Sequence, residues 1–265
     1  MTESSHSFLV PAYGQSPYLR ECLLSLISQT RPSSILISTS TPFDGLEAIA
    51  REFGARLHVH GPNRGIAHDW NEGMRRVESD WVTIAHQDDI YLPRFTEKVM
   101  SAIRHERDPS LVFTDYAEVL ADGGARRGTP LLTIKKALLN LGFLGRRSIA
   151  DRWSKLNTLR FGNAIPCPSV TLRTHPGQPH FETGLGLNMD WAAWIRKARE
   201  PGSFVWVREE LMHHRIHGQS ETTDGIATGH RREEDFAILC RMWPRFMASL
   251  IVRSYRIAYQ SNNAD

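Results

Sequence analysis

Short apolar runs and amphipathic segments alternate along the first part of the chain. The apolar runs predict buried strands at residues 8–10, 35–37, 56–60 and 81–85. The segments between them carry apolar side chains at helical spacing and predict helices at residues 18–30, 46–53, 66–77 and 93–105. Strands that alternate with helices are joined by right-handed crossovers, so the sequence predicts an α/β fold with a mostly parallel sheet.

The second half of the chain is less regular. A strand-like stretch at 111–120 followed by Asp122-Gly123-Gly124 predicts a hairpin. Residues 126–160 are basic and helical in part, and residues 218–232 are rich in Gly, Ser, Thr and Asp and predict a mobile loop. The remaining elements are predicted as strands at 169–172 and 203–207, and as helices at 189–199 and 233–259.

Composition narrows the class of protein. Hydrophobic residues make up 41% and charged residues 23% of the 265 positions, which is typical of a globular protein. The net charge of +3 comes from scattered basic residues, which argues against a nucleic-acid partner. The 3 cysteines form neither a disulfide framework nor a metal knuckle, and no apolar leader or run of about 18 apolar residues occurs. A cytoplasmic protein is therefore expected.

Two adjacent carboxylates, Asp88 and Asp89, follow the fourth predicted strand. Ligands of such sheets lie at the carboxyl ends of the strands, and unpaired carboxylates there are costly unless a positive charge joins them. Carboxylate oxygens favour Mg²⁺ or Mn²⁺, and such a cation can bridge to a diphosphate. The alternative is that both residues cap the helix that begins near Pro93. Their position in the alternating pattern favours the metal.

Three segments together carry a resemblance to a known family. They are Val10-Pro11-Ala12-Tyr13-Gly14, the helix pattern from Tyr18 to Thr30, and Asn63-x-Gly65 with Asn71-x-Gly73. With the acidic motif, they resemble the family 2 glycosyltransferases of the GT-A fold. The resemblance implies a Rossmann-like, mostly parallel central sheet flanked by helices, with a C-terminal helical extension. It implies a nucleotide-sugar-binding half at 1–125, an acceptor-binding and catalytic-base half at 126–232, and a C-terminal helix at 233–265.

The resemblance also implies site residues and partners. A nucleotide-sugar donor, expected to be a UDP-sugar, would contact Pro11, Ala12, Tyr13, Ser38, Ser40, Gly65, Asn71, Gln87, Asp88 and Arg215. A divalent Mn²⁺ or Mg²⁺ would be held by Asp88, Asp89 and His217. Two departures stand out: His86 replaces the first Asp of the family's Asp-x-Asp motif, and Ser38-Thr39-Ser40-Thr41 replaces an acidic pair after the second strand.

Inverting sugar transfer needs a general base that deprotonates the acceptor hydroxyl. The resemblance assigns this role to Asp190, at the start of a predicted helix, and places Asn163 and Trp191 on the acceptor side. The acceptor would be a saccharide or a lipid-linked sugar of bacterial polysaccharide or glycan synthesis. Residues 218–232 would form either a lid over the donor or a plain loop.

The C-terminal helix combines basic and aromatic residues: Arg241, Trp243, Arg245, Phe246, Arg253 and Arg256. These could rest on an anionic membrane at the inner face, where lipid-linked acceptors reside. Packing on the domain or dimerisation would use the same residues.

Two other functions fit parts of the sequence. His86-Gln87-Asp88-Asp89 with His214-x-x-His217 also resembles the zinc-dependent sugar N-deacetylases, in which His and Asp side chains bind a catalytic zinc. In that family, however, the motif follows the first strand, and here it follows the fourth. A protein that binds nucleotide sugars without transferring them is the other alternative, because the acids expected at 38–41 and 86 are missing.

Overall fold

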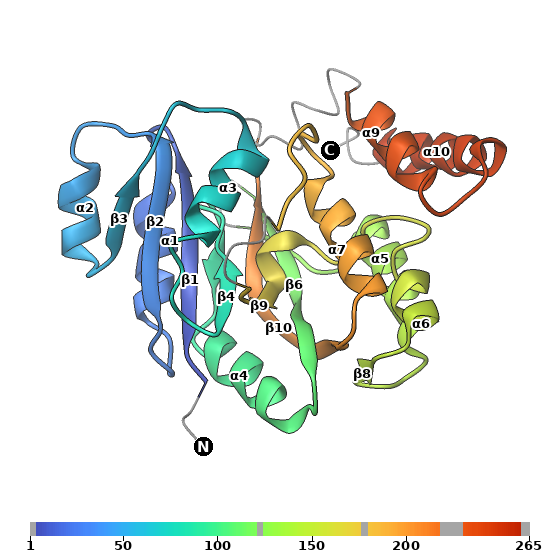
Figure 1. Ribbon diagram of the computed structural model, residues 1–265, viewed down its shortest axis with the longest axis horizontal. Coiled ribbons are helices and arrows are strands. Elements are labelled where there is room, and N and C mark those ends of the chain that lie inside the picture. The colour runs from blue at the N-terminus through green and yellow to red at the C-terminus, as the bar shows by residue number, and fades with distance from the viewer. Residues whose placement is uncertain (1–3, 121–123, 176–179, 218–229, 261–265) are drawn as a thin grey trace.

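The computed structural model of the protein describes residues 4–120, 124–175, 180–217 and 230–260. Ten strands form one sheet, in which the main path runs β3-β2-β1-β4-β9-β6-β10-β5 (Figure 1). The strands are β1 His6–Tyr13, β2 Ser34–Thr41, β3 Arg56–Val59, β4 Trp81–Ile84, β5 Ile90–Tyr91, β6 Pro109–Leu120, β7 Ala125–Arg126, β8 Ser148–Ile149, β9 Val170–Arg173 and β10 Ser203–Ile216.

The sheet is mostly parallel, as predicted. β1 pairs in parallel with β2 and β4, and β2 pairs in parallel with β3. β9 is antiparallel to both β4 and β6, so β6 runs in the same direction as β4, and β10 is parallel to β6. All the strands that run against this direction are short, and the carboxyl ends of the others lie at one edge of the sheet.

Helices cover both faces of the sheet (Figure 1). They are α1 Leu19–Ile27, α2 Leu46–Glu52, α3 Ile66–Met74, α4 Phe95–His105, α5 Pro130–Phe143, α6 Arg152–Asn157, α7 Met189–Arg199, α9 His230–Leu239 and α10 Arg245–Gln260, with a short 3-10 turn at Cys167–Ser169. One hydrophobic cluster packs α1, α2 and α4 against the sheet, and the other packs α3, α5, α7, α9 and α10.

The strand β1 shows why its sequence is continuously apolar. Phe8 and Val10 belong to the cluster under α1 and α4, whereas Leu9 belongs to the cluster under α3 and α7. Successive side chains of a strand point to opposite faces, and a parallel strand covered on both faces needs apolar residues at every position. All three side chains are fully buried.

The second half extends two of the predicted elements. The predicted hairpin is present, because β7 pairs antiparallel with the end of β6, although residues 121–123 of its turn lie outside the described part. The strand predicted at 203–207 is longer: β10 continues to Ile216 through irregularities near Val207 and Glu210. The polar run at 208–210 interrupts the apolar pattern there, which hides the continuation in the sequence.

The predicted C-terminal helix is two helices. α9 ends at Leu239 and α10 begins at Arg245, directly after Pro244, which lacks the backbone N–H that a continuous helix would use. Trp243 packs inward, since its indole nitrogen donates to the carbonyl oxygen of Arg160 at 2.6 Å, and Arg241 pairs with Glu182 at 2.8 Å.

The outer side of α10 keeps an apolar surface. Phe246 is 68% and Leu250 59% exposed, whereas Ala248 and Val252 are buried against the domain. The side chain of Arg256 lies outside the described ones. Within the described residues, every helix is too short or too polar to cross a membrane.

We predict that Gly73→Ala destabilises the protein. A Cβ at Gly73 in α3 would lie 2.7 Å from Leu9 Cδ1 and 3.1 Å from Ser38 Cβ. Such overpacking costs about 1–3 kcal/mol, which exceeds the gain of about 1 kcal/mol from alanine's helix propensity. Urea unfolding should therefore give a lower free energy of unfolding.

Gly128→Ala is the matched control, because a Cβ at that position meets no described atom within 4 Å. Its effect should stay within about 0.5 kcal/mol. Equal stabilities for the two variants would contradict the close packing of α3 on β1.

Candidate active site

Two distant segments of the chain meet at the acidic pair. Asp88 and Asp89 lie between β4 and β5, and β5 pairs antiparallel with β10, with Ile90 opposite His213. This pairing places residues 214–217 beside the acidic pair. The alternative in which the two carboxylates cap α4 is wrong, because β5 intervenes and α4 begins at Phe95.

Asp89 is fully buried, and one of its oxygens is saturated by β10. Its Oδ1 accepts hydrogen bonds from the backbone N–H of Arg215 at 2.9 Å and from Nδ1 of His214 at 3.0 Å. Its Oδ2 has no hydrogen-bond partner among the described residues and lies 3.9 Å from Nδ1 of His86. One carboxylate oxygen is thus anchored in the fold, and the other remains available to a ligand.

Electrostatics favour an ionised Asp89 beside a protonated His214. Burial by itself raises the pKa of Asp89, but His214, His86 and the Arg215 backbone N–H outweigh it and lower the pKa. Burial by itself lowers the pKa of His214, but the carboxylates of Asp89 and Asp88 raise it above the usual value. The two groups form a buried ion pair.

Asp88 is linked to the same strand end. Its Oδ2 lies 2.8 Å from Nε2 of His217, and its backbone oxygen accepts from Nε of Arg215 at 2.9 Å. Arg215 is only 5% exposed, donates to Glu21 of α1 at 2.6 Å, and lies 4.4 Å above the ring of Tyr18. Through these contacts, Arg215 connects β10 to α1 and to the loop that carries Asp88 and Asp89. Its donor contact and the metal contact of His217 stay predictions.

His86, Asp88 and Asp89 can hold a cation. Their candidate ligand atoms all lie within 4.8 Å of one another. Within the described structure, Nε2 of His86 and Oδ2 of Asp89 are buried polar atoms without hydrogen-bond partners. A divalent cation would supply the missing partner, so these residues fit one. His86 is therefore itself a candidate ligand.

Asp190 lies in the first turn of α7, and its carboxylate is held on both sides. Oδ2 accepts from Nδ2 of Asn163 at 2.7 Å, and Oδ1 accepts from the backbone N–H of Trp191 at 2.7 Å. Burial raises the pKa of Asp190 and outweighs both hydrogen bonds. Asn163, predicted to contact the acceptor, thus orients the predicted base.

Asp190 and the acidic pair face a common region. Burial raises the pKa of the Cys167 thiol, and the carboxylates of Asp190 and Asp89 both raise it further. The imidazole of His86 is also close enough to lower the pKa of Asp190. The predicted base and the candidate metal group therefore act on the same titratable side chains.

Helix α9 fixes the loop that leads into α7. The carboxylate of Glu234 accepts from the backbone N–H groups of Gly186, Leu187 and Asn188 at 2.6, 3.0 and 2.8 Å. Asp235 accepts from the side-chain amide of Asn188 at 2.8 Å. The sequence held no signal for these contacts, because they join residues 46–48 positions apart. They hold the loop directly before α7, the helix that carries Asp190 in its first turn.

The predicted donor-binding residues gather at the ends of β1 and β2. Gln87 exchanges two hydrogen bonds of 3.2 Å with the backbone of Tyr13, so its amide joins β1 to the acidic loop. The ring of Tyr13 is 62% exposed at this edge. Ser40 donates a hydrogen bond to Asp69 of α3, while Ser38 is buried. Pro11 and Ala12 belong to β1, and Gly65 precedes α3 with φ +93.

Two residues predicted to contact ligands are enclosed by the protein, and their ligand contacts stay predictions. Asn71 is 3% exposed, and its side chain bonds the backbone of His180 and Phe181 at 2.7–3.0 Å. Trp191 is 1% exposed, and its indole donates to the carbonyl oxygen of Leu159 at 2.9 Å. Both side chains are enclosed by the protein, so Asn71 anchors the segment after β9 and Trp191 is part of the core.

Comparison with known proteins decides the family. The sequence profile described as Glycosyl transferase family 2 matches residues 7–152, which is more than half of the chain. The chain belongs to glycosyltransferase family 2. The zinc-dependent deacetylase alternative is therefore wrong, although its residues His86, Asp89 and His214 do lie together.

Relatives and solved structures agree with this family. An uncharacterized glycosyltransferase of Haemophilus influenzae is 33% identical over 126 residues, which cover 43% of this chain and 46% of the relative. The chain thus spans less than half the length of that relative.

Two solved glycosyltransferases share the fold. Staphylococcus aureus TarS 1–349 in complex with UDP-GlcNAc has a TM-score of 0.65 at 14% identity, covering 94% of this chain and 70% of that chain. The mannosyltransferase PcManGT of Pyrobaculum calidifontis in complex with GDP-Man and Mn²⁺ has a TM-score of 0.65 at 15% identity, covering 96% and 70%. The fold is the predicted GT-A fold, while the internal boundaries at 125 and 232 stay predictions.

The ion pair of His214 and Asp89 predicts a pH-dependent stability in this family 2 member. The raised pKa of His214 gives stability that is fully present below pH 6.5 and is lost as pH rises through the folded-state pKa. The lowered pKa of Asp89 gives stability that is present above pH 3.8 and is lost as pH falls through its own folded-state pKa. In metal-free buffer, the stability difference between wild type and His214→Gln should be largest between these values.

Urea unfolding of both proteins across this range and up to about pH 9 measures the difference, because an ion pair contributes only while both groups are charged. The difference in the free energy of unfolding between wild type and His214→Gln should become smaller as the pH rises above the pKa of His214. A difference that grows with rising pH, or ignores pH, would mean that the ion pair does not form.

Proposed function

We propose that the protein transfers a sugar from a nucleotide-sugar donor, a UDP-sugar, to a hydroxyl of a saccharide or lipid-linked acceptor with inversion. The observation that carries this proposal is the arrangement of Asp190, held by Asn163, beside the cation-competent group of His86, Asp88 and Asp89. Family membership and the sugar-nucleotide complexes of the two solved neighbours support it.

The reaction divides between two sides of the site. On one side, Asp190 takes the proton of the acceptor hydroxyl, whose oxygen attacks the anomeric carbon. The bond from that carbon to the phosphate oxygen breaks, and its electron pair leaves with the nucleoside diphosphate. A divalent cation held by His86, Asp88 and Asp89 would stabilise the charge of the leaving diphosphate. The Mn²⁺ in the mannosyltransferase complex supports a divalent metal.

The environment of Asp190 suits a base. Burial raises its pKa, which increases its proton affinity, while the hydrogen bonds from Asn163 and Trp191 keep the carboxylate oriented. On the donor side, the exposed ring of Tyr13 offers a face on which a nucleobase can stack. Ser40 and Thr41 offer hydroxyl groups but no charge. They would therefore bind the nucleobase or the ribose by hydrogen bonds, without the acidic pair that the family often has there.

The setting of the reaction is also a proposal. Bacterial polysaccharide or glycan synthesis in the cytoplasm fits a family 2 enzyme. The exposed side chains of Phe246 and Leu250 on α10 would contact either the inner face of the membrane or a second copy of the chain. The segment at 218–232, predicted as either a lid or a plain loop, lies largely outside the described residues.

The function is tested by nucleoside diphosphate release. Purified protein with UDP- or GDP-sugars and Mn²⁺ should release the diphosphate, and Asp190→Asn should lower kcat about 10²–10⁴-fold, because the base is lost. UDP affinity should change little, because Asp190 lies on the acceptor side. Asp108→Asn is the control, since this exposed residue precedes β6 at the opposite end of the strand.

Binding of the nucleotide sugar without any release would favour the non-catalytic alternative. Full activity of Asp190→Asn would assign the base elsewhere.

A second prediction concerns the acid limb of the pH–rate profile. The hydrogen bond from Asn163 lowers the pKa of Asp190, so Asn163→Ala should raise that pKa. The base must be deprotonated, and the acid limb of kcat/KM should therefore move to higher pH in the variant. An acid limb that stays in place, or moves to lower pH, would show that Asn163 does not act on the base.

A further inference from the structure

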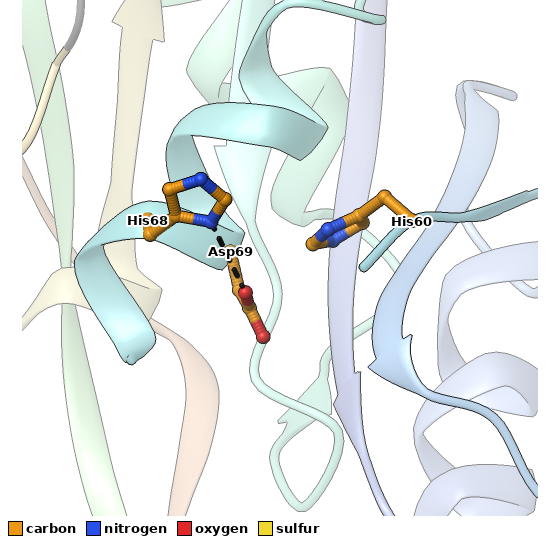
Figure 2. Close-up of side chains that lie close together, drawn as sticks. All are labelled: His60, His68 and Asp69. Carbon is orange, nitrogen blue, oxygen red and sulfur yellow. Dashed lines mark ion pairs between the residues drawn. The ribbon is translucent and has the colours of Figure 1, made fainter. Parts of the chain in front are cut away.

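A second group of potential metal ligands lies between β3 and α3. His60 directly follows β3, and His68 and Asp69 belong to the first turn of α3. Figure 2 shows the ring of His60 directed at the Asp69 carboxylate from one side and His68 next to it on the other. The candidate ligand atoms of the three residues all lie within 4.8 Å of one another.

Several polar atoms of this group are buried and lack hydrogen-bond partners. Both ring nitrogens of His60, Nδ1 of His68 and Oδ1 of Asp69 have no hydrogen-bond partner within the described part of the chain. Buried polar groups are costly without partners, and native proteins rarely leave several together. Three neighbouring side chains, each with a buried polar atom that lacks a hydrogen-bond partner, indicate that a ligand satisfies these atoms.

The outer atoms of the same side chains are held by neighbours. Oδ2 of Asp69 accepts a hydrogen bond from Ser40 of β2, which leaves Oδ1 available. Nε2 of His68 lies 3.8 Å from the Glu72 carboxylate, which leaves Nδ1 available. A carboxylate behind a histidine and a hydrogen bond to a ligating carboxylate are the usual outer contacts of metal ligands.

The spacing also fits a small transition-metal ion. Nδ1 of His68 and Oδ1 of Asp69 are 3.5 Å apart. A tetrahedral zinc with bonds of about 2.0–2.1 Å places its ligand atoms about 3.4 Å from one another. His60, whose ligand atom lies within 4.8 Å of the other two, would have to approach further to bind the same ion.

We propose that His60, His68 and Asp69 bind a divalent transition-metal ion, Zn²⁺ by preference, at a site separate from His86, Asp88 and Asp89. Two imidazoles and one carboxylate suit zinc, whereas carboxylate-rich sites suit Mg²⁺ or Mn²⁺. Water would fill the remaining position. The ion ties β3 to α3 and, through Ser40, to the end of β2, so it orders the wall on which the predicted donor-binding serines lie.

Metal titration of the full chain tests this site. Metal-free wild-type protein should bind Zn²⁺ in competition with a chromogenic chelator, and Co²⁺ should give the strong visible absorption of a four-coordinate site. His60→Ala and His68→Ala should each weaken this binding at least about 10-fold, because loss even of an outer contact weakens metal sites by that much. Asp69→Asn, which keeps an acceptor for Ser40, should do the same.

Two controls make the result specific. His105→Ala removes an exposed histidine at the end of α4, and Asp88→Asn alters the other candidate metal group; both should keep the Co²⁺ absorption. Zn²⁺ should raise the thermal midpoint of wild type but not of His60→Ala, because an ion bound only by the native state stabilises it. Unchanged Zn²⁺ affinity in the His60, His68 and Asp69 variants, or no Co²⁺ absorption in wild type, would overturn the proposal.

Discussion

The buried carboxylate of Asp89 is the interaction on which the rest of the site depends. A buried charge needs partners, and one oxygen of Asp89 receives them from the backbone of Arg215 and the imidazole of His214. Those partners are in place only because β5 pairs with β10. The other oxygen has no hydrogen-bond partner among the described residues, so one oxygen of a firmly held carboxylate remains available. We infer that this oxygen binds a cation beside the donor diphosphate.

The other side of the site depends on packing rather than charge. α7 is buried along most of its length, with Trp191 and Trp194 in the core, so Asp190 at its start has a fixed position. Glu234 and Asp235 of α9 fasten the preceding loop. The sequence alone suggests that the C-terminal helices are an extension of the domain. In the structure, α9 holds the loop before α7 and thereby helps to position the proposed base. Substitutions in α9 should affect catalysis although α9 is far from Asp190 in the sequence.

The sequence predicts the first half of the fold well, because β1, β2 and β4 are mostly buried and the helices there each have a buried face. Phe8, Leu9 and Val10 illustrate this. The full length of β10 was missed because its middle is polar. The partners of Asn71 and Trp191 within the protein could not be predicted, because side-chain chemistry alone does not reveal which backbone groups a side chain will meet. The group of His60, His68 and Asp69 was missed because its residues share no recognised spacing and meet only when β3 lies beside α3.

The central claim, that Asp88 and Asp89 hold the cation of the donor site, is tested most directly by Mn²⁺ binding measured by electron paramagnetic resonance with and without UDP. Wild type should bind Mn²⁺ more tightly when UDP is present, because the diphosphate supplies further oxygen ligands. Asp88→Asn, confirmed as folded by circular dichroism, should lose at least about 10-fold in Mn²⁺ affinity. Equal Mn²⁺ affinity in the variant and the wild type, with UDP present, would contradict the account.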